Sequence, residues 1–174
     1  MTETANITPP IEIKPPKGRI ILKQFSLSDA REIFELIDRN RDHLSQFGDE
    51  TAKKYPTVNK VIESIQNPKN PKRLRFAIRN SEGVFMGSVN LTPDEDNSQR
   101  GEVGYYMGSE FQRRGIATEA TRLLSDFAFG QLGYLTLYAK VQPDNIASQK
   151  VLTKAGFQET GIKDGDKLFT LTKK

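Results

Sequence analysis

The chain has 174 residues, of which 36% are hydrophobic, enough for one domain with a modest core and marginal for two. It contains no cysteine, which excludes disulfides, thiolate metal ligands and a cysteine nucleophile. Its formal net charge is +4, from 26 basic and 22 acidic residues. This excess favours anionic partners such as nucleic acid or a phosphorylated cofactor.

Targeting and membrane signals are weak in this sequence. No apolar run approaches the roughly 20 residues that span a bilayer, so no membrane partner is expected. Residues 1–10 lack both the basic start and the apolar stretch of a secretory signal. We therefore expect a cytoplasmic protein.

The first 18 residues are rich in proline and poor in apolar side chains. They predict a flexible tail at 1–18, ahead of a single domain at 19–174. An apolar run at 20–25 predicts the first strand.

Two helices are expected next, because apolar residues recur at helical spacing. The first follows Ser28, an expected N-cap, and carries its apolar residues at 33–37. The second follows Thr57 and ends before Pro68.

From residue 73 the apolar period changes to two, which predicts an antiparallel meander with strands at 74–78, 84–91 and 102–107. A helix with one apolar face follows at 116–128, and we expect the glycines beyond it to end it. Alternation at 134–141, with Leu135 among its inward residues, predicts the next strand.

The C-terminal part contains one more helix, beginning near Asn145 and closing at Gly156, and then two strands that include Phe157 and Phe169. The meander favours antiparallel pairing, whereas strand–helix–strand units favour parallel pairing. The fold class is therefore α/β, with a mixed central sheet of about six to seven strands flanked by helices.

The segment between the strand at 102–107 and the next helix has the composition of a phosphate-binding loop. The first N–H groups of a helix have no internal partner and carry partial positive charge, so they bind anions. A glycine and a small residue let phosphates approach the backbone, and two arginines add charge-assisted contacts. The loop consists of Gln112, Arg113, Arg114, Gly115, Ile116 and Ala117. An ordinary helix start with one glycine is the alternative.

Two other phosphate motifs are missing. The chain has neither Gly-x-x-x-x-Gly-Lys-Ser/Thr nor Gly-x-Gly-x-x-Gly. Nucleoside triphosphate and dinucleotide binding therefore lose their main support.

Two ordered blocks resemble the GNAT family of N-acetyltransferases. The first is the loop at 112–117, which matches the family's Gln/Arg-x-x-Gly-x-Gly/Ala signature. The second runs from Asn145 to the Lys-Ala-Gly-Phe segment at 154–157. The strings RIILKQFSLSDA at 19–30, GEVGYYM at 101–107 and FQRRGIATEA at 111–120 more closely resemble RimJ/RimL-type enzymes, and the resemblance covers roughly residues 19–172.

This resemblance implies the GNAT fold and acetyl-CoA as cosubstrate, with no metal. It implies that two sheet strands splay apart and that backbone groups around Met107 and Gly108 pair with the pantetheine arm in the gap. The loop at 112–117 would hold the pyrophosphate. Asn145 would bond to the pantetheine or the thioester carbonyl, and Lys150 could reach a CoA phosphate, although a solvated lysine is the commoner explanation.

Acylation requires a neutral amine, and a base that removes the ammonium proton makes one. Glu102 is the candidate base, and a strand carboxylate paired with a neighbouring cation is the equal alternative. Many GNAT enzymes protonate the leaving thiolate with a tyrosine at the position of Leu152, which cannot donate. By the same resemblance Ser148 is the candidate donor, unless it is only a residue of the first helical turn.

Two further observations concern the neighbourhood of these residues. Tyr105 and Tyr106 alternate along one strand, so one should face the cleft and the other the core. His43 is the only histidine; an exposed, non-catalytic position is expected for it, and the resemblance offers the acceptor-side wall of the site as the alternative.

The acceptor is the least determined part of the hypothesis. Resemblance favours a protein N-terminal α-amine, that of a ribosomal protein, acetylated by direct transfer. A small amine or a lysine side chain is the nearest alternative, and a CoA-binding protein without catalysis is another. Direct nucleic-acid binding has only the net charge in its favour. The protein could be a monomer or a homodimer.

Overall fold

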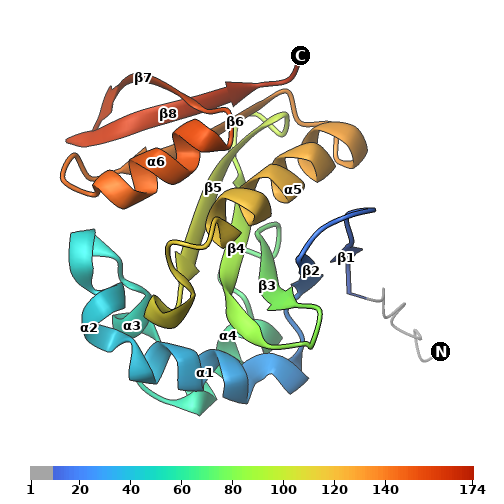
Figure 1. Ribbon diagram of the computed structural model, residues 1–174, viewed down its shortest axis with the longest axis vertical. Coiled ribbons are helices and arrows are strands. Elements are labelled where there is room, and N and C mark those ends of the chain that lie inside the picture. The colour runs from blue at the N-terminus through green and yellow to red at the C-terminus, as the bar shows by residue number, and fades with distance from the viewer. Residues whose placement is uncertain (1–9) are drawn as a thin grey trace.

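The computed structural model describes residues 10–174, which form one eight-stranded mixed sheet in the order β1-β2-β3-β4-β5-β6-β8-β7 (Figure 1). The strands are β1 (Glu12–Ile13), β2 (Ile20–Gln24), β3 (Leu74–Asn80), β4 (Phe85–Pro93), β5 (Arg100–Met107), β6 (Thr136–Val141), β7 (Gln158–Lys163) and β8 (Asp166–Thr172). Only the β5–β6 pair is parallel; the other neighbours are antiparallel. The expected mixed sheet is confirmed, with eight strands in place of six to seven.

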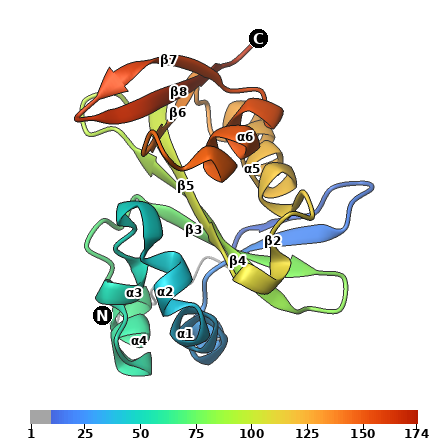
Figure 2. The same ribbon diagram turned by 60° about the vertical axis from the view of Figure 1, so that its left-hand side comes forward.

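The helices cover both faces of this sheet (Figures 1 and 2). They are α1 (Ala30–Arg39), α2 (Arg41–Leu44), α3 (Thr51–Lys54), α4 (Val58–Gln66), α5 (Ile116–Gln131) and α6 (Ile146–Lys154), with 3-10 turns at Leu27–Asp29, Gln46–Gly48 and Ser109–Phe111. Helices α1–α4 pack on one face, and α5 and α6 pack on the other. No helix within residues 10–174 is long and apolar enough to cross a bilayer.

Strand β5 shows how alternation divides the two apolar layers. Val103 and Met107 belong to the core beneath α5 and α6. Tyr106, one residue out of phase, packs with the core beneath α1–α4. Side chains at odd positions of β5 therefore face α5 and α6, and those at even positions face α1–α4.

Strands β5 and β6 pair over three residues only, from Arg100 opposite Thr136 to Glu102 opposite Tyr138. Beyond Glu102, β5 continues beside β4 as far as Met107, whereas β6 stays paired with β8. The splay that the resemblance implied is thus present. Gly101 sits at the joint, where a Cβ would lie 2.7 Å from the Tyr134 ring, so the close approach there requires glycine.

The N-terminal segment differs from the expected tail. Residues 1–9 lie outside the described residues, but β1 pairs with β2, and the Gln24 N–H donates to the Ile11 carbonyl at 2.8 Å. Ile11 and Ile13 pack on the core, so this part of the expectation is wrong. Two isoleucines between prolines are enough to form this edge strand. An edge strand tolerates nearby prolines, because the N–H that proline lacks would face solvent there.

The start of the first helical region and the strand at 134–141 also differ in detail. The cap residue is Ser26, whose N–H donates to Asp29 at 2.9 Å, and not Ser28. Strand β6 begins at Thr136, which leaves Leu135 45% exposed. Gly130 lies inside α5, and Gly133, with φ +77°, follows its end.

A buried ion pair attaches α1 to the sheet. Arg79 on β3 donates to Asp29 at 2.8 Å and to Glu32 at 3.0 Å, and the Asp29 and Arg79 side chains are 7% and 15% exposed. Glu32 is 49% exposed. Removing Asp29 would strip this guanidinium of its buried counter-charge and remove the acceptor for the Ser26 N–H.

We expect Asp29→Ala to lower the free energy of unfolding by about 2 to 4 kcal/mol, since breaking a buried pair strands a charge while Glu32 still compensates part of it. The matched Glu32→Ala should cost less than about 1 kcal/mol because that partner is half exposed. Urea unfolding followed by circular dichroism measures both. Equal losses would contradict the assigned difference.

Candidate active site

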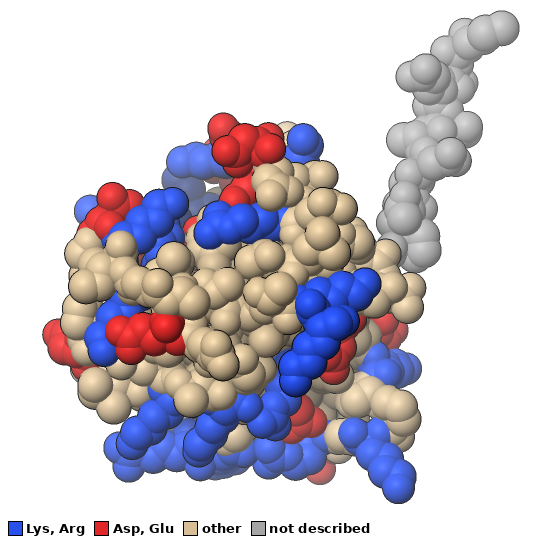
Figure 3. Space-filling model, turned by 90° about the horizontal axis from the view of Figure 1, so that it is seen from above, with Lys and Arg blue, Asp and Glu red and all other residues tan. Residues whose placement is uncertain are grey.

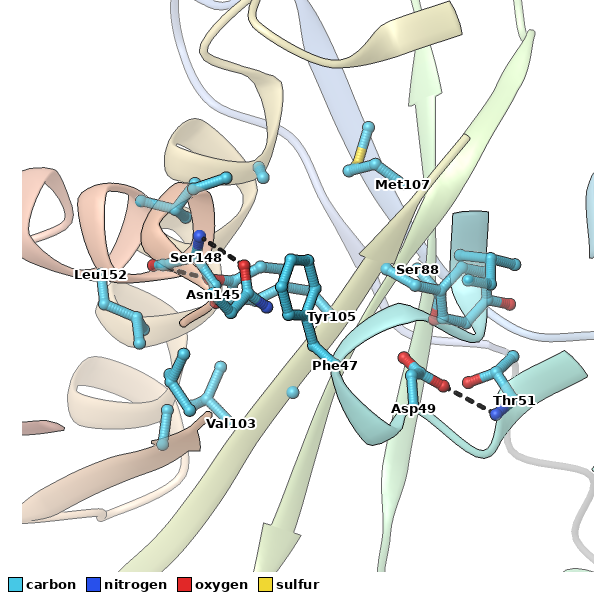
Figure 4. Close-up of a pocket in the computed structure, with 18 of the residues that line it drawn as sticks. Phe47, Asp49, Thr51, Ser88, Val103, Tyr105, Met107, Asn145, Ser148 and Leu152 are labelled. Atoms are coloured by element: carbon cyan, nitrogen blue, oxygen red, sulfur yellow. Dashed lines mark hydrogen bonds between the residues drawn. The ribbon is translucent and has the colours of Figure 1, made fainter. Parts of the chain in front are cut away.

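The opening between β5 and β6 holds a cavity of about 1230 Å³. This exceeds the 300–1,000 Å³ usual for one drug-sized ligand, so two substrates fit. Side chains from both faces of the sheet line it: Ser148 and Ile116 come from α6 and α5, and His43 and Phe47 come from the α1–α4 side. Figure 4 shows Tyr105, Ser148 and Asn145 grouped on one side, with Ser88 and Asp49 on the other.

One end of the cavity is the loop before α5. Gly115 is the N-cap, with φ +74°, and Arg113 also has a positive φ of 61°. The Glu119 N–H is the first to bond inside the helix, to the Gly115 carbonyl at 3.0 Å. The N–H groups from Ile116 to Thr118 therefore precede the helical ladder and are available to an anion.

A network outside the loop holds it in place. Arg19 donates to the Arg114 carbonyl at 2.8 Å and to the Glu119 carboxylate at 3.2 Å, and its own N–H donates to the same carboxylate at 3.1 Å. Sequence reasoning missed both Arg19 and Glu119. The two lie 100 positions apart, and no local pattern connects them.

The residues expected to bind the pantetheine arm are placed at the splay, with one restriction. Met107 lines the cavity, but the Gly108 N–H already donates to the Met86 carbonyl at 3.0 Å, and the Gly108 carbonyl accepts from Phe111 at 3.0 Å. Gly108 therefore has no free N–H for a ligand. The groups still without a strand partner are those on the β6-facing edge of 103–107.

At the beginning of α6, Asn145 accepts the Ser148 N–H at 3.2 Å and so caps the helix. Its side-chain amide N–H groups have no partner among the described residues and lie beside the cavity. Lys150 also lines the cavity but is exposed.

Tyr105 and Ser148 form a hydroxyl pair inside the cavity, with their oxygens 2.6 Å apart (Figure 4). Burial raises the pKa of Tyr105 to about 12, although the bond to Ser148 partly offsets it. The phenol therefore stays protonated at neutral pH. Leu152, at the position of the family's usual tyrosine, is 0% exposed and belongs to the core.

The two tyrosines do not divide between cleft and core as expected, because both line the cavity. The cavity passes through the sheet, so opposite faces of β5 both border it. Tyr106 lies on the α1–α4 side, where burial raises its pKa well above its usual range. The alternation is confirmed, and Tyr106 does pack against the core beneath α1–α4, but it borders the cavity as well.

Glu102 lies on the same face as Tyr106 and lines the cavity. Its carboxylate is 3.8 Å from the ammonium of Lys140. The two alternatives for Glu102 are a base in the site and a carboxylate paired with a cation. The structure shows the position that the first requires and the neighbouring cation that the second requires.

The wall opposite α6 comes from the α1–α4 side. His43 belongs to it, on α2, and is half-buried. Phe47 adopts a left-handed conformation, φ 56°, and its ring points toward Tyr105 (Figure 4). A Cβ at Gly48 would lie 2.4 Å from the Gln142 amide, so this turn reaches across the gap to the end of β6.

The surface charge is unevenly distributed. In Figure 3, Lys and Arg side chains gather in a band along the lower edge of the view, while Asp and Glu are scattered. Within residues 10–174, no group of three or more His, Asp or Glu side chains is arranged to hold a metal ion.

Comparison with known proteins identifies the family. The GNAT acetyltransferase domain matches residues 19–158. The probable N-acetyltransferase YjcK of Bacillus subtilis (strain 168) is 33% identical over 153 residues, 84% of this chain and of that one. The spermidine N(1)-acetyltransferase of Escherichia coli (strain K12) is 23% identical over 147 residues, 84% of this chain and 77% of that one.

Solved structures share the fold. RimL, the ribosomal L7/L12 alpha-N-protein acetyltransferase, in complex with coenzyme A, matches with a TM-score of 0.80 at 17% identity, over 92% of this chain and 97% of that one. The family match spans most of the chain, and it agrees with the loop at the head of α5. The protein belongs to the GNAT family of N-acetyltransferases.

Proposed function

We propose that this enzyme transfers the acetyl group of acetyl-CoA directly to the N-terminal α-amine of a protein, as ribosomal-protein acetyltransferases do. One observation carries the proposal: a single cavity joins the helix N-terminus of α5, through the β5–β6 gap, to the face covered by α1–α4. The likeness to RimL supports the choice of acceptor.

The α5 loop fits the coenzyme's pyrophosphate. The N–H groups of residues 116–118 and the positive end of a 16-residue helix favour an anion there. Arg113 and Arg114 precede them in the chain and are exposed, and Arg113 lines the cavity. The unpaired edge of β5 can form main-chain hydrogen bonds with an extended arm, as a further strand would.

When bound, acetyl-CoA supplies a thioester whose acetyl carbon accepts the amine and whose sulfur leaves. In this proposal the Tyr105–Ser148 hydroxyl pair hydrogen-bonds to the departing sulfur. A phenol with a pKa of about 12 does not transfer its proton completely to a thiolate, whose conjugate acid titrates near 8.5. The pair therefore stabilises the developing charge by hydrogen bonding.

The acceptor's own chemistry favours an α-amine. At pH 7.4 about a fifth of an α-amine with a pKa near 8 is neutral, against about a thousandth of a lysine amine near 10.4. The Glu102 carboxylate can accept the amine's proton, directly or through water. The Lys140 ammonium competes with that proton for the same carboxylate. Such modest base catalysis suits the α-amine better.

A small polyamine is the second candidate, because the spermidine N(1)-acetyltransferase is among the relatives. Thiol release from acetyl-CoA with N-terminal peptides and spermidine compares the two acceptors. If neither the peptides nor spermidine causes thiol release, the result would favour a CoA-binding protein without catalysis.

Gly115→Glu should weaken CoA binding at least about 100-fold, because its carboxylate would repel the phosphates and its Cβ would strain a left-handed residue. Isothermal titration with CoA measures the effect. Gly133→Glu is the matched control: it has the same left-handed φ, +77°, nothing within 4 Å of its Cβ, and the same added charge beyond the far end of α5. Equal affinity in the two variants would contradict the loop assignment.

Tyr105→Phe and Ser148→Ala should each lower kcat about 10- to 100-fold, and the double variant should lose little more, because the hydroxyls act as one unit. The KM for acetyl-CoA should change much less. Tyr134→Phe, which removes a hydroxyl outside the cavity, is the control. Independent, multiplicative losses would argue against a shared role.

Glu102→Gln should slow acetylation most at low pH, where nearly all the acceptor is ammonium and a base is needed. The loss should shrink as pH rises through the α-amine pKa near 8, because the neutral amine then forms without help. A pH profile of kcat/KM from 6 to 9 measures this. A pH-independent ratio of the two enzymes would remove Glu102 from the base role.

A further inference from the structure

A half-buried arginine whose Nε is fully buried faces the half of the cavity covered by α1–α4. Arg73, immediately before β3, lines the cavity. Among the buried side-chain polar atoms of residues 10–174, its Nε is the one with no hydrogen-bond partner. Native proteins rarely leave a buried donor unsatisfied, because a desolvated donor without a partner destabilises the fold.

A second arginine lies beside it. Arg75, two residues along on β3, also lines the cavity, and its charge acts on Arg73. Its guanidinium donates to Ser64 Oγ at 3.2 Å and to the Tyr55 hydroxyl at 3.2 Å, and it lies 4.7 Å from the centre of the Phe25 ring. The groups that hold Arg75 are all neutral, so none of them is a counter-ion for its positive charge.

Neither arginine forms an ion pair with any carboxylate in the described part of the chain. The carboxylates on this side of the cavity have other partners: Glu102 is near Lys140, and Asp49 accepts the Thr51 N–H at 2.7 Å (Figure 4). Burial, and then the neighbouring charge of Arg75, lower the pKa of Arg73, and the nearby Glu102 carboxylate offsets only part of that lowering. Two cations are therefore held together at a cost in desolvation and repulsion.

We propose that this enzyme's acceptor carries an anionic group, a carboxylate or a phosphate, which Arg73 binds while the amine reaches the β5–β6 opening. The inference rests on the proposed function and specifies the acceptor's chemistry. In the sheet register, Arg75 on β3 lies opposite Asn90 on β4, and Asn90 lies opposite Gly104 on β5. At about 4.8 Å per strand spacing, the anion would lie roughly 5 to 10 Å from the amine.

That separation suits an acidic side chain within the first few residues of a peptide, or the acid group of a small amino compound. A charge-assisted bond to Arg73 would satisfy its Nε and offset the repulsion from Arg75. The same two charges repel a polyamine, so spermidine should be a poor acceptor.

The anion site can be tested without catalysis. Inorganic phosphate is titrated into CoA-saturated protein, so that the α5 loop is filled, and the Arg73 Nε–H signal is followed by NMR, assigned by its loss in Arg73→Gln. A saturable shift supports the site, and no shift up to tens of millimolar phosphate overturns it. Arg73→Gln should not lower the melting temperature, because its Nε has no protein partner to lose.

The acceptor preference is tested with matched amines. One arm uses C-terminally amidated peptides that begin Ser-Asp, Ser-Asn or Ser-Lys; the other compares phosphoethanolamine with ethanolamine, and glycine with glycinamide. In at least one arm the acidic member should have a kcat/KM about 10- to 100-fold above its neutral partner. Arg73→Gln should bring that ratio near one, whereas Arg31→Gln, the same charge change at an exposed position, should leave it unchanged.

The two proposals fail differently. Acetylation without any preference for acidic amines, or a preference that survives in Arg73→Gln, overturns the anion site and leaves the acetyltransferase function intact. If no amine releases thiol, the proposed function fails, and the phosphate titration still decides whether Arg73 binds an anion.

Discussion

The parting of β5 and β6 after three paired residues is the constraint on which the site depends. A continuous ladder would satisfy the backbone groups of both strands and seal the sheet. Here β6 remains with β8 while β5 remains with β4, so residues 103–107 keep one edge free. Everything assigned to the active site borders this opening: the head of α5, the hydroxyl pair of Tyr105 and Ser148, and Glu102.

The parts of the site that could be predicted from the sequence are local ones. A glycine next to a helix start, with a small residue following, is encoded within six consecutive positions, and the structure places Gly115 at the N-cap of α5, where its φ is +74°. The cap at Asn145 is equally local, since its acceptor serves a residue three positions on. The mixed sheet followed from periodicity and from the strand–helix–strand order, both of which are properties of short windows.

Long-range pairings account for what could not be predicted. Tyr105 and Ser148 meet across 43 positions, and Arg19 reaches the α5 loop across nearly 100. The strand at 12–13 exists because β2 offers an edge, which no proline count reveals. In the sequence, Arg73 is one more charged residue next to an alternating strand, and only its buried, unpartnered Nε and the neighbouring charge of Arg75 distinguish it.

A cavity bordered by both faces of one sheet also bears on the order of events. The α5 side and the α1–α4 side each contribute their own lining, so neither partner needs to leave before the other arrives. Steady-state measurements should then give intersecting reciprocal plots, the mark of a ternary complex, and not the parallel lines of a double-displacement enzyme. In the proposed direct transfer, the gap in the sheet thus makes an acylated side chain unnecessary as a carrier.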